Sequence, residues 1–245
     1  MQLRNVYKTS FAGNVMETLK KNYFVEMTFS GYANGTLFDS NIPEDLKKIH
    51  PEGKAEPLIV IVGQGMVVPG LDTALEGKEV GKHYEIQISV KEGFGERRKE
   101  LLKTLPLKVF HAQKIQPYAG QTLFMDGTLA KVVAVSGARV MTDFNNPLAG
   151  KELIYKFTIT RKITEEKEKC EQLFKVLLKE VPEFTSGEKV TLKGPKNLEI
   201  IVKAFGNKFK EIIGKELAFE LKEEAKEKKN DERDSSNDPL KSTTA

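Results

Sequence analysis

The side chains in this sequence that could do chemistry are mostly apolar and aromatic. There is no phosphate-binding loop, zinc-protease helix or nucleophile elbow. Gly63-Gln64-Gly65 follows an apolar strand, but Val68 occupies the sixth position, so the dinucleotide-binding pattern is not met. What remains is one acid among apolar positions, which periodicity alone makes core residues: Phe29, Phe38, Asp39, Leu58, Val67, Val68, Leu71, Phe94 and Tyr155. Their arrangement along the chain makes them a candidate site.

Metal and thiol chemistry finds little support in the sequence. The single cysteine, Cys170, excludes an intrachain disulfide and a zinc site built on several cysteines. It lies on the apolar face of an expected helix, which makes it a small core residue. His50, His83 and His111 show no metal-ligand spacing. We therefore expect neither a metal nor a cofactor.

The composition is that of a soluble globular protein. The chain has 245 residues, enough for one or two domains and a small third. Hydrophobic residues make up 39% and charged residues 30%. No apolar run approaches the length of a membrane span, and no basic stretch leads into an apolar one at the N-terminus. These features predict a cytoplasmic protein with no membrane partner.

The positive charge is concentrated in one central segment. The net charge is +4, yet residues 97–147 alone hold 8 basic and 3 acidic side chains. Such a segment could attract nucleic acid or acidic clients, or could be an ordinary solvated face.

Strand and helix signals cover residues 16–163. Asn34-Gly35 is a strong turn signal between two strands, and Leu71, Ala74 and Leu75 share one face of a short helix. The expected strands are 24–29, 36–39, 58–62, 84–90 and 153–163, and the expected helix is 69–77. Three short strands joined by hairpin turns are expected within 97–147.

The period changes at Thr164, where an amphipathic helix carrying Cys170, Leu173 and Phe174 begins. Strands are expected at 189–193 and 198–203, and residues 206–222 are ambiguous between helix and strand. Residues 1–15 show no pattern, and Met16 looks like a natural chain start. Residues 223–245 are almost free of apolar side chains and are predicted to be disordered.

Three blocks of this sequence resemble one family. They are Phe29-Ser-Gly31 with 34–40, then 63–77 with Val80-Gly81 and Gly93-Phe-Gly95, and then 143–153. In this order they resemble the FKBP-type peptidyl-prolyl isomerases, and the third resembles the return segment of the SlyD-like branch. The resemblance covers about residues 16–163, and the C-terminal part weakly resembles the extra domain of long archaeal members.

The resemblance implies an α+β fold, with an antiparallel sheet wrapped around a short helix. It places the isomerase domain at 16–96 and 148–163, and a small β domain, here called the insert, at 97–147. A C-terminal α+β domain would occupy 164–222, between an N-terminal extension (1–15) and the tail (223–245).

The resemblance also implies an activity. Rotation about a peptide bond has a barrier of about 18–20 kcal/mol, which an apolar pocket can lower because a twisted amide has less charge separation. Asp39 would supply a carboxylate near the rotating amide, and the Val68 N–H would bind a substrate carbonyl. The family pattern places Leu58 on the wall and the following around the proline ring: Phe29, Phe38, Val67, Val68, Leu71, Phe94 and Tyr155.

The sequence departs from the family pattern at three of these positions. Phe29 and Phe94 stand where tyrosine is common, and Leu71 replaces the tryptophan of single-domain members. Because these hydroxyls are missing, the sequence also allows an alternative function, that of a non-catalytic protein that binds proline segments. There is no histidine-rich tail, so nickel binding is not supported.

The insert is rich in large apolar groups for its size, and a module that small cannot bury them all. The resemblance implies that it captures unfolded or partly folded proline-containing polypeptides. The candidate client contacts are Phe110, Phe124, Met125, Met141 and Phe144. The alternatives are packing against the rest of the chain, and a nucleic-acid or ribosome surface binder using the basic charge. A homodimer through the C-terminal domain is also expected.

Overall fold

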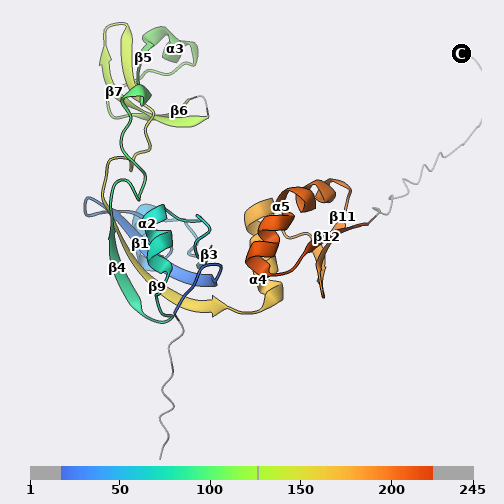
Figure 1. Cartoon of the computed structure of the whole chain (residues 1–245). Helices are drawn as coiled ribbons and strands as arrows, with labels where there is room; N and C mark the ends of the chain where they lie inside the picture. Colours follow the sequence, from blue (N-terminus) through green and yellow to red (C-terminus); the bar gives the residue numbers. More distant parts are fainter. Residues whose placement is uncertain (1–17, 126, 223–245) are drawn as a thin grey trace, which may run out of the picture. The chain divides into compact units, whose positions relative to one another are not determined.

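The computed structural model describes residues 18–125 and 127–222 (Figure 1). The expected N-terminal extension (1–15) and tail (223–245) lie outside the described residues. The chain divides into two compact units, residues 1–172 and 173–245. No helix in the described ranges is both long enough and apolar enough to cross a bilayer.

A five-stranded antiparallel sheet forms the centre of the first unit. Four of the strands follow the order β2-β1-β9-β4. The fifth strand, β3, pairs with the first half of β1, along the same edge that pairs with β2 in its second half. The strands are β1 (Phe24–Ala33), β2 (Thr36–Ser40), β3 (Leu58–Ile61), β4 (His83–Ile88) and β9 (Leu153–Ile163). All five strand predictions are confirmed to within a few residues.

The helix α2 (Pro69–Leu75) lies against this sheet, as predicted (Figure 1). Leu71 and Leu75 are buried in a core shared with Val25, Met27 and Phe157. A second short helix, α1 (Pro43–Ile49), falls in a stretch where no element was expected. The sequence does contain helix signals here, because the first turn holds Pro43 and two acidic residues and the last turn holds two lysines.

Two glycines shape the edge of the sheet near the candidate site. Asn34 and Gly35 both have positive φ, 50° and 76°, which confirms the predicted two-residue turn between β1 and β2. Gly31 has a different role. A Cβ at this position would lie 2.8 Å from Cζ of Phe38, so only glycine lets that ring approach β1.

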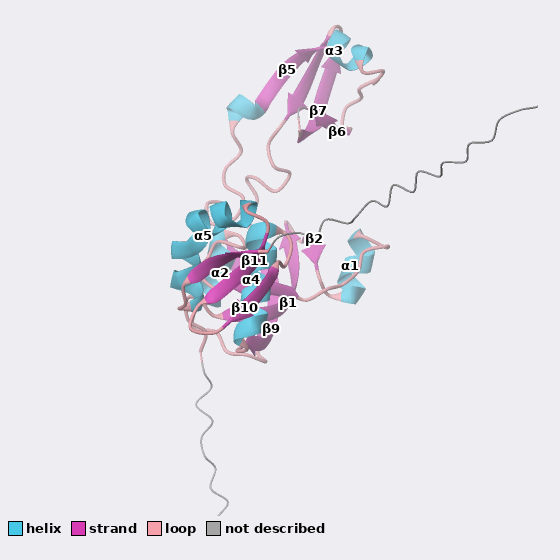
Figure 2. Cartoon of the chain, turned by 90° about the vertical axis from the view of Figure 1, so that its right-hand side faces the viewer, coloured by secondary structure: helices cyan, strands magenta, loops and turns pink. Residues whose placement is uncertain are grey.

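The insert is a four-stranded antiparallel sheet with the order β5-β8-β7-β6. Figure 2 shows α3 beside its strands. The elements are the 3₁₀ turn η1 (Lys99–Leu101), β5 (Leu102–Pro106), α3 (Leu107–Ala112), β6 (Thr122–Met125), β7 (Thr128–Ser136) and β8 (Arg139–Asp143). The expectation of three strands was incomplete: β5 was missed because it lacks alternation and ends in proline, which an edge strand tolerates.

The helix α4 (Glu166–Leu178) confirms the predicted change of period, and Cys170 on it is buried. Beyond it lie β10 (Glu183–Ser186), β11 (Val190–Gly194), α5 (Asn197–Ile213) and β12 (Leu217–Leu221), with sheet order β10-β11-β12. The predicted strand at 198–203 was wrong, because this segment is the start of α5. Its β-branched residues suggested a strand, but Leu198, Ile201, Val202, Phe205 and Phe209 follow a helical period.

Candidate active site

A cavity of about 480 Å³ opens in the first unit beside α2. Its walls bring together seven of the sequence-predicted residues and two that sequence reasoning missed, Gly65 and Met66. The seven are Phe29, Asp39, Leu58, Val67, Val68, Leu71 and Tyr155. Met66 lies inside the motif that was recognised, so its position between Gly65 and Val67 was an available signal.

Phe38 and Phe94 are not among the residues that line this cavity, but they support its wall. The Phe38 ring meets the Tyr155 ring edge-on at 5.9 Å and the Phe94 ring at 6.3 Å. Phe29 contacts the same Tyr155 ring in a tilted arrangement, with ring centroids 6.0 Å apart. Edge-to-face pairs such as the two made by Phe38 are favourable, so the four rings hold one another in place.

Strand register explains why two of these rings meet. In the β1–β9 pair, Phe29 is opposite Phe157 and Gly31 is opposite Tyr155. Phe29 and Tyr155 are therefore diagonal neighbours on one face of the sheet, within reach of aromatic side chains. Leu71 of α2 also lines the cavity and is 2% exposed.

The loop between β3 and α2 is fixed by a carboxylate that sequence reasoning also missed. Asp72 accepts hydrogen bonds from the backbone N–H groups of Gly63 and Gly65, each at 2.8 Å. Both glycines have positive φ. The Sδ atom of Met66 accepts a further bond from the Ile61 N–H at 3.2 Å. These contacts position the residues that follow, Val67 and Val68, at the mouth of the cavity.

Polar groups at the cavity come from two elements. Asp39 of β2 is exposed at the rim, and the side chain of Tyr155 is buried. Burial, together with the nearby negative charge of Asp39, raises the pKa of Tyr155 to about 12. The phenol therefore keeps its proton at neutral pH and can donate a hydrogen bond.

A backbone donor is also available. Val68 is the N-cap residue of α2, and its carbonyl accepts from Leu71 and Asp72. The first N–H groups of a helix have no partner within the helix. Val68 lines the cavity, so its backbone lies at the N-terminal end of α2 beside that space.

The arrangement suits the twisting of an amide better than bond cleavage. The cavity has apolar walls, one exposed carboxylate, one phenol and one backbone N–H. Within residues 18–125 and 127–222 there is no group of three or more histidine, cysteine or acidic side chains that could hold a metal ion. A sheet wrapped on a short helix around such a cavity defines the class of proline isomerases built on the FKBP fold.

Comparison with known proteins supports this assignment. Residues 16–113 match the family model for FKBP-type peptidyl-prolyl cis-trans isomerase, and residues 103–148 match that for the FKBP26 IF domain. The chain is 33% identical over 148 residues to a short-type peptidyl-prolyl cis-trans isomerase of Methanocaldococcus jannaschii, covering 59% of this chain and 93% of that protein. It is 28% identical over 156 residues to the isomerase SlyD of Helicobacter pylori, covering 62% and 78%.

The protein belongs to the FKBP-type peptidyl-prolyl cis-trans isomerase family, and it is an enzyme of that type. Membership of this family of enzymes favours catalysis over the alternative of a non-catalytic binding protein. It also confirms the resemblance on which the α+β fold was expected.

The five candidate client contacts of the insert differ in how far they are buried. Phe124 is 70% exposed and Met141 is 44% exposed. Phe110 and Met125 are buried in the insert core with Ala130, so placing them at the client surface was wrong. The helix α3, absent from the sequence prediction, carries Phe110 inward.

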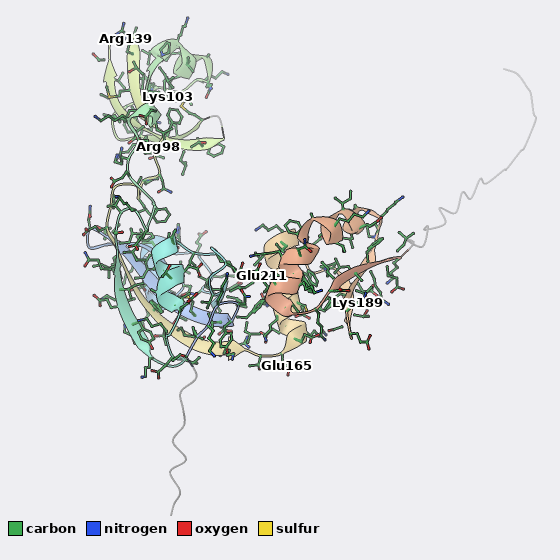
Figure 3. The ribbon with its side chains drawn as sticks, viewed as in Figure 1. Arg98, Lys103, Arg139, Glu165, Lys189 and Glu211 are labelled. Carbon is green, nitrogen blue, oxygen red and sulfur yellow. The ribbon has the colours of Figure 1, made fainter. Side chains whose placement is uncertain are left out.

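Phe144 is half-buried against the insert core and lies 5.1 Å from the ammonium group of Lys103. Exposed apolar residues that were not named as contacts are Leu102, Tyr118, Leu129, Val133 and Val135. Figure 3 labels three of the insert's cations, Arg98, Lys103 and Arg139.

Proposed function

We propose that the insert holds unfolded proline-containing polypeptides while the pocket isomerises their X–Pro bonds. The observation that carries this proposal is the construction of the insert sheet. Ala130, Val132 and Val140 are buried with Phe110 of α3 on one face. Their neighbours in sequence, including Leu129, Val133 and Met141, are exposed.

Strand pairing gathers the exposed residues into one surface. Phe124 of β6 is opposite Leu129 of β7, and Met141 of β8 is opposite Ala134 of β7. We call the exposed residues Phe124, Leu129, Val133 and Met141 the open face. Exposed apolar patches on soluble proteins mark interaction sites, and methionine adapts to varied partners.

In the pocket, the proline ring packs among Phe29, Leu71 and Tyr155, with Leu58 and Val67 at its sides. The Val68 N–H donates to a carbonyl of the substrate, and Asp39 stabilises the rotating amide from the rim. Phe38 and Phe94 act by holding the Tyr155 ring. X–Pro bonds exchange in tens to hundreds of seconds without a catalyst, which makes them slow steps in folding.

The test compares an open-face variant with a matched control. Phe124→Ala with Met141→Ala should weaken binding to a reduced, carboxymethylated protein about tenfold, because it removes most of the adaptable apolar area. Its kcat/KM on a proline tetrapeptide should not change. Val181→Ala, which trims an exposed apolar side chain outside the insert, should change neither quantity. Unchanged binding in the double variant would contradict the proposal.

The C-terminal unit supports a second proposal, that two copies of the chain pair through it. Ile200 on α5 is 69% exposed, although it lies two residues from the buried Leu198. Sedimentation equilibrium tests the pairing by comparing Ile200→Glu with Lys203→Glu, a charge change one turn further along α5. Only Ile200→Glu should dissociate into monomers. Dissociation of both variants or of neither would contradict a role for Ile200.

A further inference from the structure

Two chain segments connect the insert to the isomerase domain, and we call them the neck (residues 95–101 and 144–150). At the insert end the β5–β8 ladder stops at the pair Leu102 and Asp143, followed by a bond from the Phe144 N–H to the Leu101 carbonyl at 2.9 Å. At the other end the Gly150 N–H donates to the Gly95 carbonyl at 2.8 Å. Between these ends, the neck is bridged by a side chain.

That side chain is Asn145. Its Oδ1 atom accepts from the Arg98 N–H at 2.8 Å, and its Nδ2 atom donates to the Arg98 carbonyl at 3.0 Å. These are the two bonds that a residue of a neighbouring antiparallel strand would make. The carboxamide of Asn145 therefore continues the ladder where the two backbones no longer pair.

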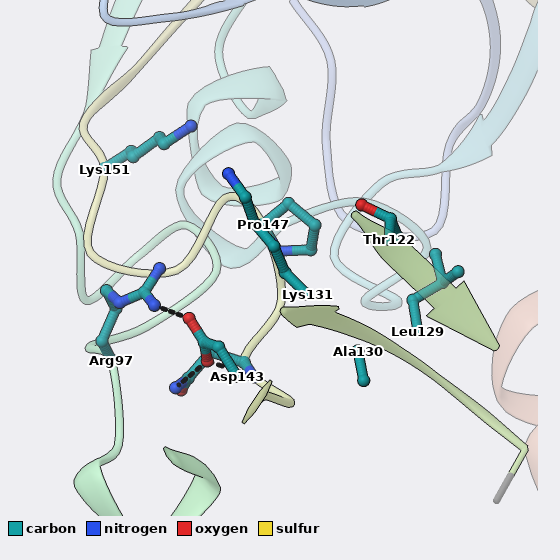
Figure 4. A pocket seen from close by; sticks show the side chains of 9 residues that line it. Arg97, Thr122, Leu129, Ala130, Lys131, Asp143, Pro147 and Lys151 are labelled. Carbon is teal, nitrogen blue, oxygen red and sulfur yellow. Dashed lines mark hydrogen bonds and ion pairs between the residues drawn. The ribbon is translucent and has the colours of Figure 1, made fainter. Parts of the chain in front are cut away.

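Asp143 holds this carboxamide in place. One of its carboxylate oxygens accepts from Asn145 Nδ2 at 2.8 Å and from the Asn145 N–H at 2.9 Å. The other oxygen pairs with the guanidinium of Arg97, which Figure 4 shows reaching across to it. Asp143 and Asn145 are only 6% and 7% exposed. Every side-chain polar atom of Asp143 and Asn145 thus has a partner, which is the condition for a buried network to rigidify a structure.

The cluster stands next to both working parts of the molecule. Asp143 ends β8, which carries Met141 of the open face. On the other side, Gly95 directly follows Phe94, whose ring supports the pocket wall. The cluster lines a cavity together with Leu129 of the open face, whereas Phe124 and Met141 lie outside that cavity. A change at Asn145 therefore acts on the connection between the two parts and leaves the two open-face side chains that test capture in place.

We propose that Asn145, held by Asp143 and Arg97, is a positioning residue that fixes the insert so that a client held there reaches the pocket. The inference rests on the proposed client capture. A bound client meets the pocket at an effective concentration that depends on how stiff the connection is. Loosening the neck should lower this concentration without changing capture or intrinsic catalysis.

The test is Asn145→Asp, with Asn146→Asp as its control. An aspartate at 145 loses both donated bonds and stands beside the Asp143 carboxylate, while Asn146 is an exposed neighbour whose Oδ1 only accepts from Leu148. In Asn145→Asp, ¹⁵N relaxation should show the insert tumbling faster than the isomerase domain. Its kcat/KM on a refolding protein should fall about fivefold. Its tetrapeptide turnover and its affinity for a carboxymethylated protein should match Asn146→Asp.

The outcomes are separable. A loosened insert with unchanged refolding activity, or an insert that stays fixed, overturns the inference. Failure of the proposed capture would instead appear as unchanged affinity in the Phe124→Ala, Met141→Ala variant. If Asn145→Asp unfolds the insert, Arg97→Ala replaces it. This variant removes the ion pair and the Arg97 stem beside Gly150, but it keeps the Asn145 bonds to Arg98 and Asp143. It should show the same pattern with about half the effect, and unchanged refolding activity in it overturns the inference as well.

Discussion

The pocket and the open face are both apolar, but they are built in opposite ways. The pocket is concave, its aromatic rings are held by contacts with one another, and its loop is held by the Asp72 bonds. In the insert, α3 covers one side of a small sheet, and the open face is the other, uncovered side. Rigidity suits a group that must match a transition state, whereas an uncovered sheet face suits many different chains.

Removing the insert is the change with the largest expected effect on this comparison. Replacing residues 97–147 by a short loop should leave a folded domain, because the Gly150–Gly95 bond keeps the two ends together. Refolding of a protein with a slow prolyl step should lose about a hundredfold in kcat/KM, since the tethering gain disappears. Tetrapeptide turnover, measured on the same two proteins, should stay near that of the full chain.

Two results would change the comparison. Equal losses on both substrates would make the insert part of the catalytic structure. No loss on either would mean that the open face has no role in capture.

The Asp72 carboxylate provides the next largest effect, on stability. Asp72→Ala leaves the N–H groups of Gly63 and Gly65 without their acceptor and should lower the free energy of unfolding by about 2 kcal/mol. Urea unfolding measures this loss. The tetrapeptide KM should change in Asp72→Ala, and it should stay unchanged in the control Asp45→Ala, which removes a carboxylate on α1 away from the pocket loop. If the KM of Asp72→Ala is also unchanged, other contacts fix the loop.

Asp39→Ala tests the catalytic half directly. With the rim carboxylate gone, kcat/KM on a tetrapeptide should fall at least about tenfold, or about 1.4 kcal/mol of transition-state stabilisation. Glu56→Ala, an exposed acid just before β3, is the control. Full activity in a well-folded Asp39→Ala protein would remove Asp39 from the mechanism.

The smallest expected effect is a pH dependence at Tyr155. Its pKa of about 12 exceeds the ordinary value of 10, so between these values the unfolded chain has lost a proton that the folded protein keeps. Stability should therefore be complete below pH 10 and fall as the pH rises, by about 1 kcal/mol at pH 11. Tyr155→Phe should lack this part of the alkaline loss in thermal melts. Identical alkaline curves for the two proteins would contradict the pKa shift.

Most of the isomerase sheet and seven cavity residues could be predicted from the sequence. Strand alternation, Asn34-Gly35 and the helix at 69–77 are local signals, and the family motifs run through the same residues. Asp72 and Asn145 also lie within the recognised blocks, but what they bind could not be predicted from the motifs. Their roles depend on which distant backbone groups lie beside them, and that is a property of the folded chain.

The errors in the insert and the C-terminal unit also have a common cause. Phe110 and Phe124 look alike in a sequence, and only the presence of α3 decides that one is buried and the other exposed. In the same way, 197–213 contains both a β-branched run and a helical period. The partners of the segment decide between them, because packing overrides propensity.

The Gly95–Gly150 bond also has a consequence for the order of folding. The pairing of β4 with β9 must close a chain loop that includes residues 96–149 and therefore the whole insert. If the insert folds first, its neck brings the two ends together, and the effective loop shrinks to roughly ten residues. The entropy cost of closing the loop then falls by about 1.5 kcal/mol. The insert would thus speed the folding of its own isomerase domain before it meets any client.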